Sequence, residues 1–286
     1  MVPKVVGSNP IFHPNKHEES ALGSILFSFS LNMKQTILSL LTLAMALTWF
    51  QSVAQPQVVA HRGHWRAEGS AQNSIRSLVK ADSIGCEATE FDVWMTRDGT
   101  VFVNHDPTIN GIEIQKSKAS EVARQRLPNG EPIPTLDQLL TAAETLKIDL
   151  VCELKPHADK QQELQAVRKI IAAVRRHGLE ARTSYITFSY PGLRMLIKYA
   201  PAGTEVYYLN GELSPATLKG LGAAGLDYNL SVMRRRPEWF TQSRELGLKT
   251  NVWTVDAQEN MEWLIERGAD YITTNEPELL QRLIKR

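Results

Sequence analysis

Short apolar, β-branched segments alternate with segments of helical periodicity along the chain, and this order restricts the fold more than any other feature of the sequence. Eight segments are predicted as strands, at residues 58–63, 88–95, 150–154, 184–189, 205–209, 226–232, 250–255 and 271–274. Helices are predicted between them at residues 73–84, 162–177, 191–199, 237–246 and 259–267. Several of these helices are followed by a glycine, which commonly ends a helix.

The strand–helix order predicts an α/β fold with a parallel sheet. Eight such units in about 230 residues have the size and order of a TIM (β/α)8 barrel. A doubly wound open sheet is the competing architecture, but no glycine-rich phosphate loop follows the first strand, where that fold usually has one. After the second strand, the turn signal Thr96-Arg97-Asp98-Gly99 and residues 101–104 predict a small hairpin that leads into an inserted loop reaching about Pro134.

The N-terminal region has the pattern of an export signal. From Met33, a single lysine precedes a mostly apolar stretch at residues 36–50, and small residues follow it up to Ala54. This order predicts a signal peptide at residues 33–54 and export to the periplasm or the extracellular space, with no membrane span after cleavage. An uncleaved membrane anchor is the alternative, because the stretch is close to the lower limit for a spanning helix. Residues 1–32 are expected to be a non-structural extension, and residues 55–286 the domain.

The composition excludes several classes of protein. Of 286 residues, 43% are hydrophobic and 22% are charged, which is typical of globular proteins and not of collagen, coiled coils or disordered chains. The formal net charge of +1 gives no sign of the basic surface that binds nucleic acid. The two cysteines, Cys86 and Cys152, are too few for a disulfide framework and lack zinc-ligand spacing. We expect both thiols to be unpaired.

Chemically reactive residues lie near the ends of successive predicted strands, where a barrel of this kind has its active site. His61-Arg62-Gly63 ends the first strand, and Glu90 and Asp92 in the second strand share one face because they are two residues apart. Glu153 and Lys155 repeat this spacing in the third strand. Carboxylates from neighbouring strands repel one another unless a cation or protons compensate. The three acidic residues therefore predict a site for a hard cation, Ca²⁺ or Mg²⁺ rather than zinc.

Each of these features also has a purely structural explanation. A His-Arg-Gly tripeptide often occurs by chance at the end of a strand, and Glu153 with Lys155 could form an internal ion pair. His105-Asp106 could simply close the hairpin. Their joint occurrence, in order, after successive strands is what favours a functional site.

Taken together, the motifs resemble those of the glycerophosphodiester phosphodiesterase family, in its secreted bacterial form. The matching motifs are His-Arg-Gly at 61–63, Glu-x-Asp-Val at 90–93, Thr-x-Asp-Gly at 96–99, His-Asp at 105–106, Glu-x-Lys at 153–155, Asn-Val-Trp-Thr-Val at 251–255 and Gly-Ala-Asp-Tyr-Ile-Thr-Thr-Asn at 268–275. The resemblance implies a TIM barrel and an enzyme that hydrolyses glycerophosphodiesters to glycerol phosphate and an alcohol.

The resemblance also implies roles for single residues. His61 and His105 would be the general acid/base pair, and Glu90, Asp92 and Glu153 would bind a divalent metal ion, Ca²⁺ or Mg²⁺. The substrate's own glycerol hydroxyl would attack the phosphorus first, and water would then open the cyclic phosphate. Histidine suits proton transfer near neutral pH. Which histidine is the acid and which is the base stays open at this point.

Three further residues would bind the substrate. Arg62 and Lys155 would hold phosphate oxygens, and Trp253 would line the pocket unless it belongs to the barrel core. One position departs from the family pattern: Gln72 stands where the family usually has a glutamate, so a neutral amide replaces a carboxylate near the metal. The next residue, Asn73, matches the family and is expected to be the N-cap of the following helix.

Two other functions remain as alternatives. A phospholipase-D-like enzyme acting on lysolipids or sphingolipids would need an apolar approach to the barrel mouth. A catalytically weak protein that binds phosphodiesters is conceivable because of Gln72, but both histidines are retained. The expected partner of the leading function is a small glycerophosphodiester, and no motif indicates an oligomeric state.

Overall fold

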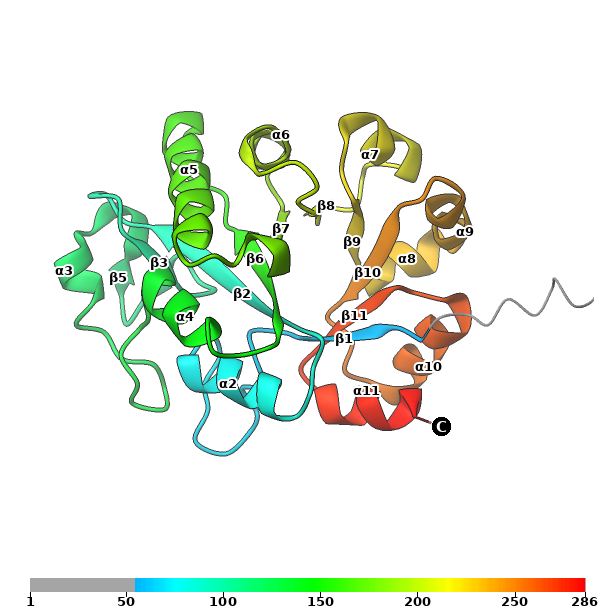
Figure 1. Ribbon diagram of the computed structural model, residues 1–286, viewed down its shortest axis with the longest axis horizontal. Coiled ribbons are helices and arrows are strands. Elements are labelled where there is room, and N and C mark those ends of the chain that lie inside the picture. The colour runs from blue at the N-terminus through cyan, green and yellow to red at the C-terminus, as the bar shows by residue number, and fades with distance from the viewer. Residues whose placement is uncertain (1–54, 286) are drawn as a thin grey trace, which may run out of the picture. The chain divides into compact units, whose positions relative to one another are not determined.

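Eight parallel strands close into a barrel in the computed structural model, which describes residues 55–285 (Figure 1). In chain order they are β1 (Gln57–Ala60), β2 (Ala88–Met95), β6 (Asp149–Leu154), β7 (Thr183–Thr187), β8 (Val206–Tyr208), β9 (Gly225–Asn229), β10 (Lys249–Trp253) and β11 (Tyr271–Thr274). Each strand pairs with the next, and β11 pairs with β1 to close the ring. The predicted TIM barrel is confirmed. The extension at residues 1–32 and the signal peptide at residues 33–54 lie outside the described residues.

Helices surround the ring of strands (Figure 1). They are α2 (Ile75–Ser83), α4 (Leu136–Ala143), α5 (Lys160–Arg176), α6 (Tyr190–Tyr199), α7 (Pro215–Leu221), α8 (Leu230–Arg235), α9 (Glu238–Glu245), α10 (Gln258–Arg267) and α11 (Pro277–Ile284), with a short 3-10 turn η2 (Glu180–Arg182) before β7. Several helices begin at a side-chain cap: the hydroxyl of Ser189 accepts a hydrogen bond from Gly192 at the start of α6, and Asp159 caps α5. Burial of apolar side chains between strands and helices supplies most of the stability of such helices.

All eight residues of β2 are buried, because helices cover one face of the strand and the barrel interior covers the other. Phe91 and Val93 point outward and belong to the main hydrophobic core beneath the helices. Each such side chain contributes roughly 1.5–3 kcal/mol by leaving water. The alternate residues, Glu90 and Asp92, therefore point into the barrel. The same alternation in β6 turns Cys152 outward and Glu153 inward.

The segment between β2 and α4 is an insertion with a small core of its own. β3 (Val101–Val103) pairs antiparallel with β2, which confirms the predicted hairpin. The rest of the insertion holds a second hairpin, β4 (Thr108–Ile109) with β5 (Ile112–Glu113), followed by η1 (Ile114–Lys116) and α3 (Ala119–Val122). Its apolar side chains pack on Trp94 at the end of β2 and on Ala71, and they are Phe102, Ile109, Ile114, Val122, Leu127 and Ile133.

Several local predictions are wrong. The strands predicted over residues 58–63, 184–189 and 250–255 end earlier, at Ala60, Thr187 and Trp253. The strand predicted over residues 226–232 ends at Asn229, whose side chain accepts a hydrogen bond from the backbone N–H of Ser231 and starts α8. Asn73 is not the N-cap of α2, because the hydroxyl of Ser74 accepts the hydrogen bond from the N–H of Ser77. Asn73 instead has a left-handed backbone with φ of 59°, a conformation that asparagine tolerates better than most residues.

Both cysteines are buried and free, as predicted. The register of the two strands explains why they do not meet. Cys152 lies opposite Phe91, whereas Cys86 precedes the first residue of β2. Cys86 therefore lies five residues before Phe91, the residue level with Cys152, and this offset along the strands keeps the thiols apart.

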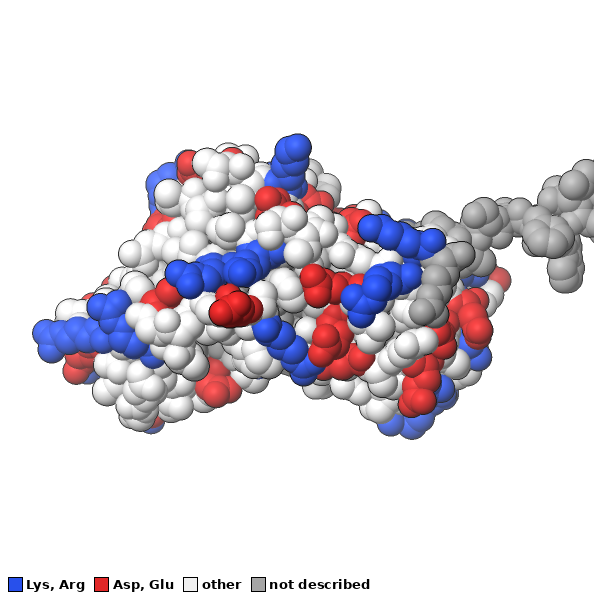
Figure 2. Space-filling model, turned by 90° about the horizontal axis from the view of Figure 1, so that it is seen from below, with Lys and Arg blue, Asp and Glu red and all other residues white. Residues whose placement is uncertain are grey.

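The surface carries both signs of charge. On the face seen from below, acidic and basic side chains are interspersed rather than gathered in one field (Figure 2). Among residues 55–285, no helix combines the length and the apolar character that crossing a bilayer requires.

Candidate active site

A cavity of about 100 Å³ opens at the carboxyl end of the barrel strands. Most of the predicted site residues line it: His61, Arg62, Glu90, His105, Glu153, Lys155 and Trp253. The remaining predicted residue, Asp92, is buried beside them and contacts Lys155. A wider cavity of about 470 Å³ is lined by residues from the start of the strands, and none of the predicted site residues lines it. We therefore assign the candidate active site to the smaller cavity, at the end of the barrel where enzymes of this fold have theirs.

The turn after β1 explains why His-Arg-Gly holds this position. Arg62 and Gly63 both have left-handed backbones, with φ of 57° and 79°. A Cβ atom on Gly63 would lie 2.3 Å from the hydroxyl of Ser77 on α2, so only glycine fits. The turn brings the backbone N–H of Arg62 to 2.9 Å from Glu90 Oε2, which it donates to. One strand end thus places a histidine, an arginine and a backbone donor at the acidic residues of the next strand.

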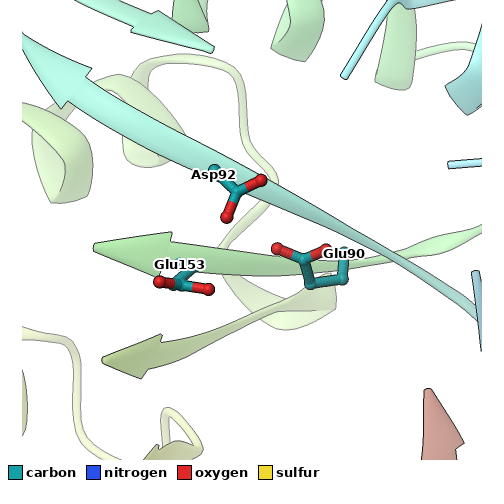
Figure 3. Close-up of side chains that lie close together, drawn as sticks. All are labelled: Glu90, Asp92 and Glu153. Atoms are coloured by element: carbon teal, nitrogen blue, oxygen red, sulfur yellow. The ribbon is translucent and has the colours of Figure 1, made fainter. Parts of the chain in front are cut away.

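Glu90, Asp92 and Glu153 converge inside the barrel (Figure 3). One oxygen from each lies within 4.8 Å of the others, and all three side chains are buried. Burial and the negative charges of its two neighbours raise the pKa of Glu90 well above its usual value. Burial and the charge of Asp92 also raise the pKa of Glu153, to about 8. The cluster therefore holds protons at neutral pH when no cation is bound.

Lys155 compensates part of this charge. Its ammonium lies 2.8 Å from Asp92 Oδ1 and 2.7 Å from Glu153 Oε1. Burial alone would raise the pKa of Asp92, but Lys155 and His105 hold it below its usual value. Burial alone would lower the pKa of Lys155, yet Asp92 and Glu153 raise it. The internal ion pair considered from the sequence thus exists, and it lies within the site.

The donor set fits a divalent metal ion. Oε1 of Glu90 is buried and has no hydrogen-bond partner in the described part of the chain. It is therefore free to bind a cation together with the other two carboxylates. A buried oxygen without a partner costs about 1–3 kcal/mol unless a ligand or a proton satisfies it. Ligands that are all carboxylate oxygens suit Ca²⁺ or Mg²⁺ rather than zinc.

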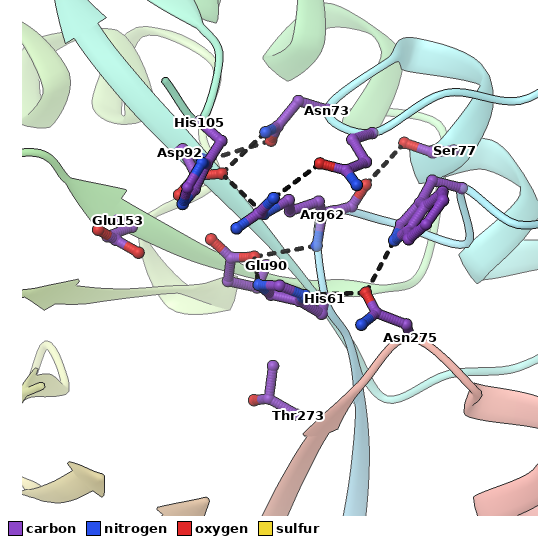
Figure 4. Close-up of polar contacts among 12 residues, drawn as sticks. His61, Arg62, Asn73, Ser77, Glu90, Asp92, His105, Glu153, Thr273 and Asn275 are labelled. Atoms are coloured by element: carbon purple, nitrogen blue, oxygen red, sulfur yellow. Dashed lines mark hydrogen bonds and ion pairs between the residues drawn. The ribbon is translucent and has the colours of Figure 1, made fainter. Parts of the chain in front are cut away.

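His61 is fixed by a network that the sequence did not predict (Figure 4). Its Nδ1 lies 2.9 Å from Oδ1 of Asn275, which also accepts a hydrogen bond from Trp65 Nε1 at 2.8 Å. Asp256 accepts hydrogen bonds from the side chain and backbone N–H groups of Asn275, and this orients the amide. Because Oδ1 only accepts, Nδ1 of His61 carries the proton and Nε2 is left bare, 4.0 Å from Glu90 Oε2. Burial, with Arg62 next, lowers the pKa of His61 to about 4.

His105 reaches the cavity from the insertion, and Figure 4 shows its ring beside Asp92. Its Nδ1 lies 2.7 Å from Oδ1 of Asp106, while its backbone carbonyl accepts a hydrogen bond from Trp94 Nε1. Burial lowers the pKa of His105 below its usual value, and the hydrogen bond to Asp106 opposes this shift. Asp106 thus orients a site histidine, in addition to the hairpin-closing role considered from the sequence.

Arg62 and Asn73 contact the cluster from the turn between β1 and α2 (Figure 4). The guanidinium of Arg62 lies 3.6 Å from Asp92 Oδ2 and donates from Nη1 to Gln72 Oε1 at 2.7 Å. Gln72, the departure from the family pattern, is therefore an orienting partner of Arg62, and it is not one of the three clustered carboxylate ligands. Asn73 donates to Asp92 Oδ2 at 2.8 Å.

The opposite wall of the cavity is mostly apolar. It consists of Ile186, Phe188, Leu209 and Trp253, and the rings of Phe188 and Trp253 meet edge to face at 5.5 Å. Trp253 thus lines the cavity, and its Nε1 donates to the backbone carbonyl of Asp227. Polar side chains inside barrel strands, such as Asp227, were missed because only the register shows which of them face the cavity. Asn275 could have been found, since it ends the last quoted motif directly after a strand.

Comparisons with known proteins agree with the fold and with the resemblance that the motifs carry. The chain matches the family model described as "Glycerophosphoryl diester phosphodiesterase family" over residues 61–279. A glycerophosphodiester phosphodiesterase from Caldanaerobacter subterraneus is 28% identical over 243 residues, which cover 80% of this chain and 98% of the relative. A solved glycerophosphodiester phosphodiesterase from Parabacteroides distasonis is 45% identical with a TM-score of 0.80, over 81% of this chain and 97% of that one. An Oleispira antarctica phosphodiesterase, solved with the product sn-glycerol-3-phosphate, shares the fold at 22% identity, with a TM-score of 0.70 over 81% of this chain and 98% of that one.

Proposed function

The chain belongs to the glycerophosphoryl diester phosphodiesterase family and is a glycerophosphodiester phosphodiesterase, and we propose that it cleaves its substrate with one divalent metal ion and two histidines. The observation that carries the proposal is the meeting of two histidines with three buried carboxylates. His61 lies beside Glu90, and His105 lies beside Asp92, around a single cavity. A phosphodiester needs its charge neutralised, its attacking hydroxyl deprotonated and its leaving oxygen protonated. This group of residues meets each need.

Glu90, Asp92 and Glu153 would hold the metal ion. When bound, Ca²⁺ or Mg²⁺ supplies positive charge for the nonbridging oxygens of the phosphate. Lys155 already lies among these carboxylates, and Arg62 lies on the other side of Asp92. Both side chains therefore present positive charge to a phosphate in the cavity. Gln72 holds the guanidinium of Arg62 in place by accepting its hydrogen bond. Because the amide is neutral, it does not neutralise the positive charge of Arg62 as a carboxylate would.

His61 is the better candidate for the general base of the first step. Its bare Nε2 accepts the proton of the glycerol hydroxyl next to the phosphate, and the freed oxygen attacks the phosphorus. The low pKa keeps the ring neutral at physiological pH, so it is available to accept. Asn275 holds the ring orientation through Nδ1.

His105 is then the general acid. As the bond from phosphorus to the leaving alcohol breaks, the alcohol oxygen takes a proton from the ring of His105. Burial lowers the pKa of His105, and the negative charge of Asp92 and the hydrogen bond to Asp106 oppose this shift, so both carboxylates support the protonated ring that this step requires. In the second step the roles reverse: His105 takes a proton from water as the water oxygen attacks the phosphorus of the cyclic phosphate. The bond from phosphorus to the first attacking glycerol oxygen breaks, and His61 returns its proton to that oxygen. Glycerol phosphate and an alcohol are the products, and both histidines end as they began.

The small size of the cavity favours glycerophosphodiesters over lysolipids and sphingolipids. Its volume of about 100 Å³ is too small to enclose an acyl chain, although its apolar wall is the kind of approach that a lysolipid needs, so the substrate panel below decides between the two. We also propose that the protein is exported to the periplasm or the extracellular space, on the strength of the signal pattern at residues 33–54.

A substrate panel tests the proposal. Protein stripped of metal with EDTA is assayed by ³¹P NMR on glycerophosphocholine, glycerophosphoethanolamine, lysophosphatidylcholine and sphingomyelin, with and without Ca²⁺ or Mg²⁺. We expect glycerol phosphate from the first two substrates only when metal is present, with a cyclic phosphate visible early. Turnover of the lipids alone would favour the phospholipase-D-like alternative. Binding without turnover of any substrate would favour the phosphodiester-binding protein.

A further inference from the structure

The cavity has a charged half and an apolar half, and one carboxyl group lies on the apolar side. The charged residues come from β1, β2, β6 and the insertion, whereas Ile186, Phe188, Leu209 and Trp253 form the opposite wall. Asp227 on β9 also lines the cavity. It belongs to none of the metal-ligand groups in the described chain. Its place on the apolar side therefore needs an explanation of its own.

The strand register shows where Asp227 lies. Inward-facing residues of alternate barrel strands form layers, as is usual for this fold. The pairings of neighbouring strands place Asp227 in the layer of Glu90, with β9 across the barrel from β2. The other two members are Ile186 and Thr273, and all four line the cavity. This layer is the floor of the cavity, beneath His61 and Trp253.

The carboxyl of Asp227 is buried and incompletely satisfied. The residue is 1% exposed, and Oδ1 has no hydrogen-bond partner among residues 55–285. Removing a polar group from water without a partner is costly, so such a group on the floor of a cavity is available to a polar atom of a ligand that enters the cavity. Burial raises the pKa of Asp227 to about 8 and a hydrogen bond from Asn251 opposes this shift, so the protonated carboxyl, which can both donate and accept, is favoured near pH 7.

From this arrangement we propose that Asp227 is a specificity residue that hydrogen-bonds the terminal hydroxyl of the substrate's glycerol group. The proposal rests on the proposed function. With the phosphate at Arg62 and Lys155, the glycerol carbons lie against the apolar wall. The hydroxyl nearest the phosphate is the attacking group at His61. The hydroxyl at the far end of the three-carbon chain then reaches the floor on the opposite side, where Asp227 is.

Binding of product analogues tests this without requiring turnover. Calorimetry compares sn-glycerol-3-phosphate with 1,2-propanediol 1-phosphate, which lacks only the terminal hydroxyl, with Ca²⁺ present throughout. We expect wild-type protein to bind the deoxy analogue roughly ten- to hundredfold more weakly, because a buried carboxyl loses its partner. Equal affinities in the wild type would overturn the proposal. Such a result would leave the proposed function intact if glycerophosphodiesters are still hydrolysed.

Variants test whether Asp227 causes the difference in affinity between sn-glycerol-3-phosphate and the deoxy analogue, which we call the discrimination. Asp227→Asn keeps a donor and an acceptor and is expected to keep the discrimination, whereas Asp227→Leu is expected to bind both ligands equally. Asp227→Ala is the second test should the leucine variant not fold, which circular dichroism shows. Asp149→Asn is the matched control, because Asp149 lines only the wider cavity at the other end of the barrel. Asp227 borders that cavity too, so unchanged discrimination in Asp227→Leu or Asp227→Ala would mean that Asp227 serves the wider cavity and would overturn the proposal.

Discussion

Asn73 binds Asp92 with both ends of its amide: Nδ2 donates to Oδ2 of Asp92 at 2.8 Å, and Oδ1 accepts from the backbone N–H of Asp92 at 3.1 Å. The contact joins the turn before α2 to the strand that carries two of the three proposed metal ligands. It also requires the left-handed backbone of Asn73, with φ of 59°. The residue thus combines a conformational role with a positioning role, and substitutions can separate the two.

We expect Asn73→Gly and Asn73→Ala to lower activity to a similar extent, because both release Asp92. Asn73→Ala should in addition lose about 1 kcal/mol of stability relative to Asn73→Gly, since alanine disfavours a left-handed backbone. This difference corresponds to a melting temperature about 2–4 °C lower for a domain of this size. Thermal melts and initial rates of the two variants check the prediction. Equal melting temperatures would contradict the conformational part, and full activity would contradict the positioning part.

Loss of either site histidine should abolish most of the activity independently. His61→Ala and His105→Ala each remove one proton-transfer group, an effect of roughly 10²–10⁴ in kcat. His177→Ala is a matched control, because His177 contacts Asp137 and Glu144 on the outer helices and lies away from the cavity. The measurement is kcat at saturating substrate and metal. Near-normal turnover in one of the site variants would exclude the two-histidine mechanism.

Chelation should stop the reaction, and Ca²⁺ or Mg²⁺ should raise the melting temperature, because a cation that binds only the folded state stabilises it. Glu153→Gln is expected to weaken metal binding while the protein stays folded. Glu163→Gln, which changes another buried glutamate outside the carboxylate cluster, should leave metal binding unchanged. Full activity in excess EDTA, or melting curves that do not respond to metal, would refute the assignment.

Metal binding at pH 7 should release protons. In the metal-free site the pKa of Glu153 is raised to about 8 and that of Glu90 is raised well above its usual value, so protons occupy the cluster. A cation displaces them, since carboxylates bind metal in the ionised form. Calorimetric titrations with Ca²⁺ in buffers of different ionisation enthalpy measure the number released. We expect the number to fall as the pH rises above about 8, and buffer-independent heats at pH 7 would contradict the protonated cluster.

Asp227 should make stability depend on pH. Its pKa is 3.8 when exposed and about 8 in the folded protein, so between these values the folded state binds more protons than the unfolded state. Stability from this group is therefore lost as the pH rises from about 4 to about 8. Asp227→Asn removes the titration. Its melting temperature should therefore rise relative to that of the wild type as the pH increases over this range. A constant difference between the two proteins across pH 4–8 would show that Asp227 is ionised when folded.

The sequence predicted the barrel because each strand is a short apolar run between helical segments, and β2 was predicted to the residue since it is buried on both faces. Strand ends were less certain where a polar residue starts a helix, as Asn229 does for α8. The helix α4 was not predicted, although Thr135 and Gln138 form a capping box that could have indicated it. Short elements of the insertion, such as β4, depend on packing against Trp94 that no local pattern shows.

The site was predicted through motifs, and what was missed lies outside them. Glu90, Asp92 and Glu153 could be grouped because their spacing fixes the face on which they lie. Asp227 could not be grouped with them, because a single acidic residue within a strand can be assigned to the cavity only when the register of the neighbouring strands is known. The left-handed backbone of Asn73 could likewise not be predicted. Asn73 and Ser74 are equally good N-cap residues by type, so the sequence does not show which of them caps α2.

Because the cavity is divided into a charged half and an apolar half, substrate preference and bond-breaking chemistry can change separately during the evolution of such enzymes. The proposed proton-transfer and phosphate-binding groups lie at the ends of β1, β2 and β6 and in the insertion, and Asn275 after β11, held by Asp256 after β10, supports them. The strands from β7 to β10 supply the apolar wall and part of the floor, which in our proposal face the organic part of the substrate. Mutations in that half can alter the accepted alcohol or polyol while the bond-breaking machinery stays unchanged. A chimera that takes β7 to β10 from a relative should therefore inherit the relative's substrate preference and keep this chain's chemistry.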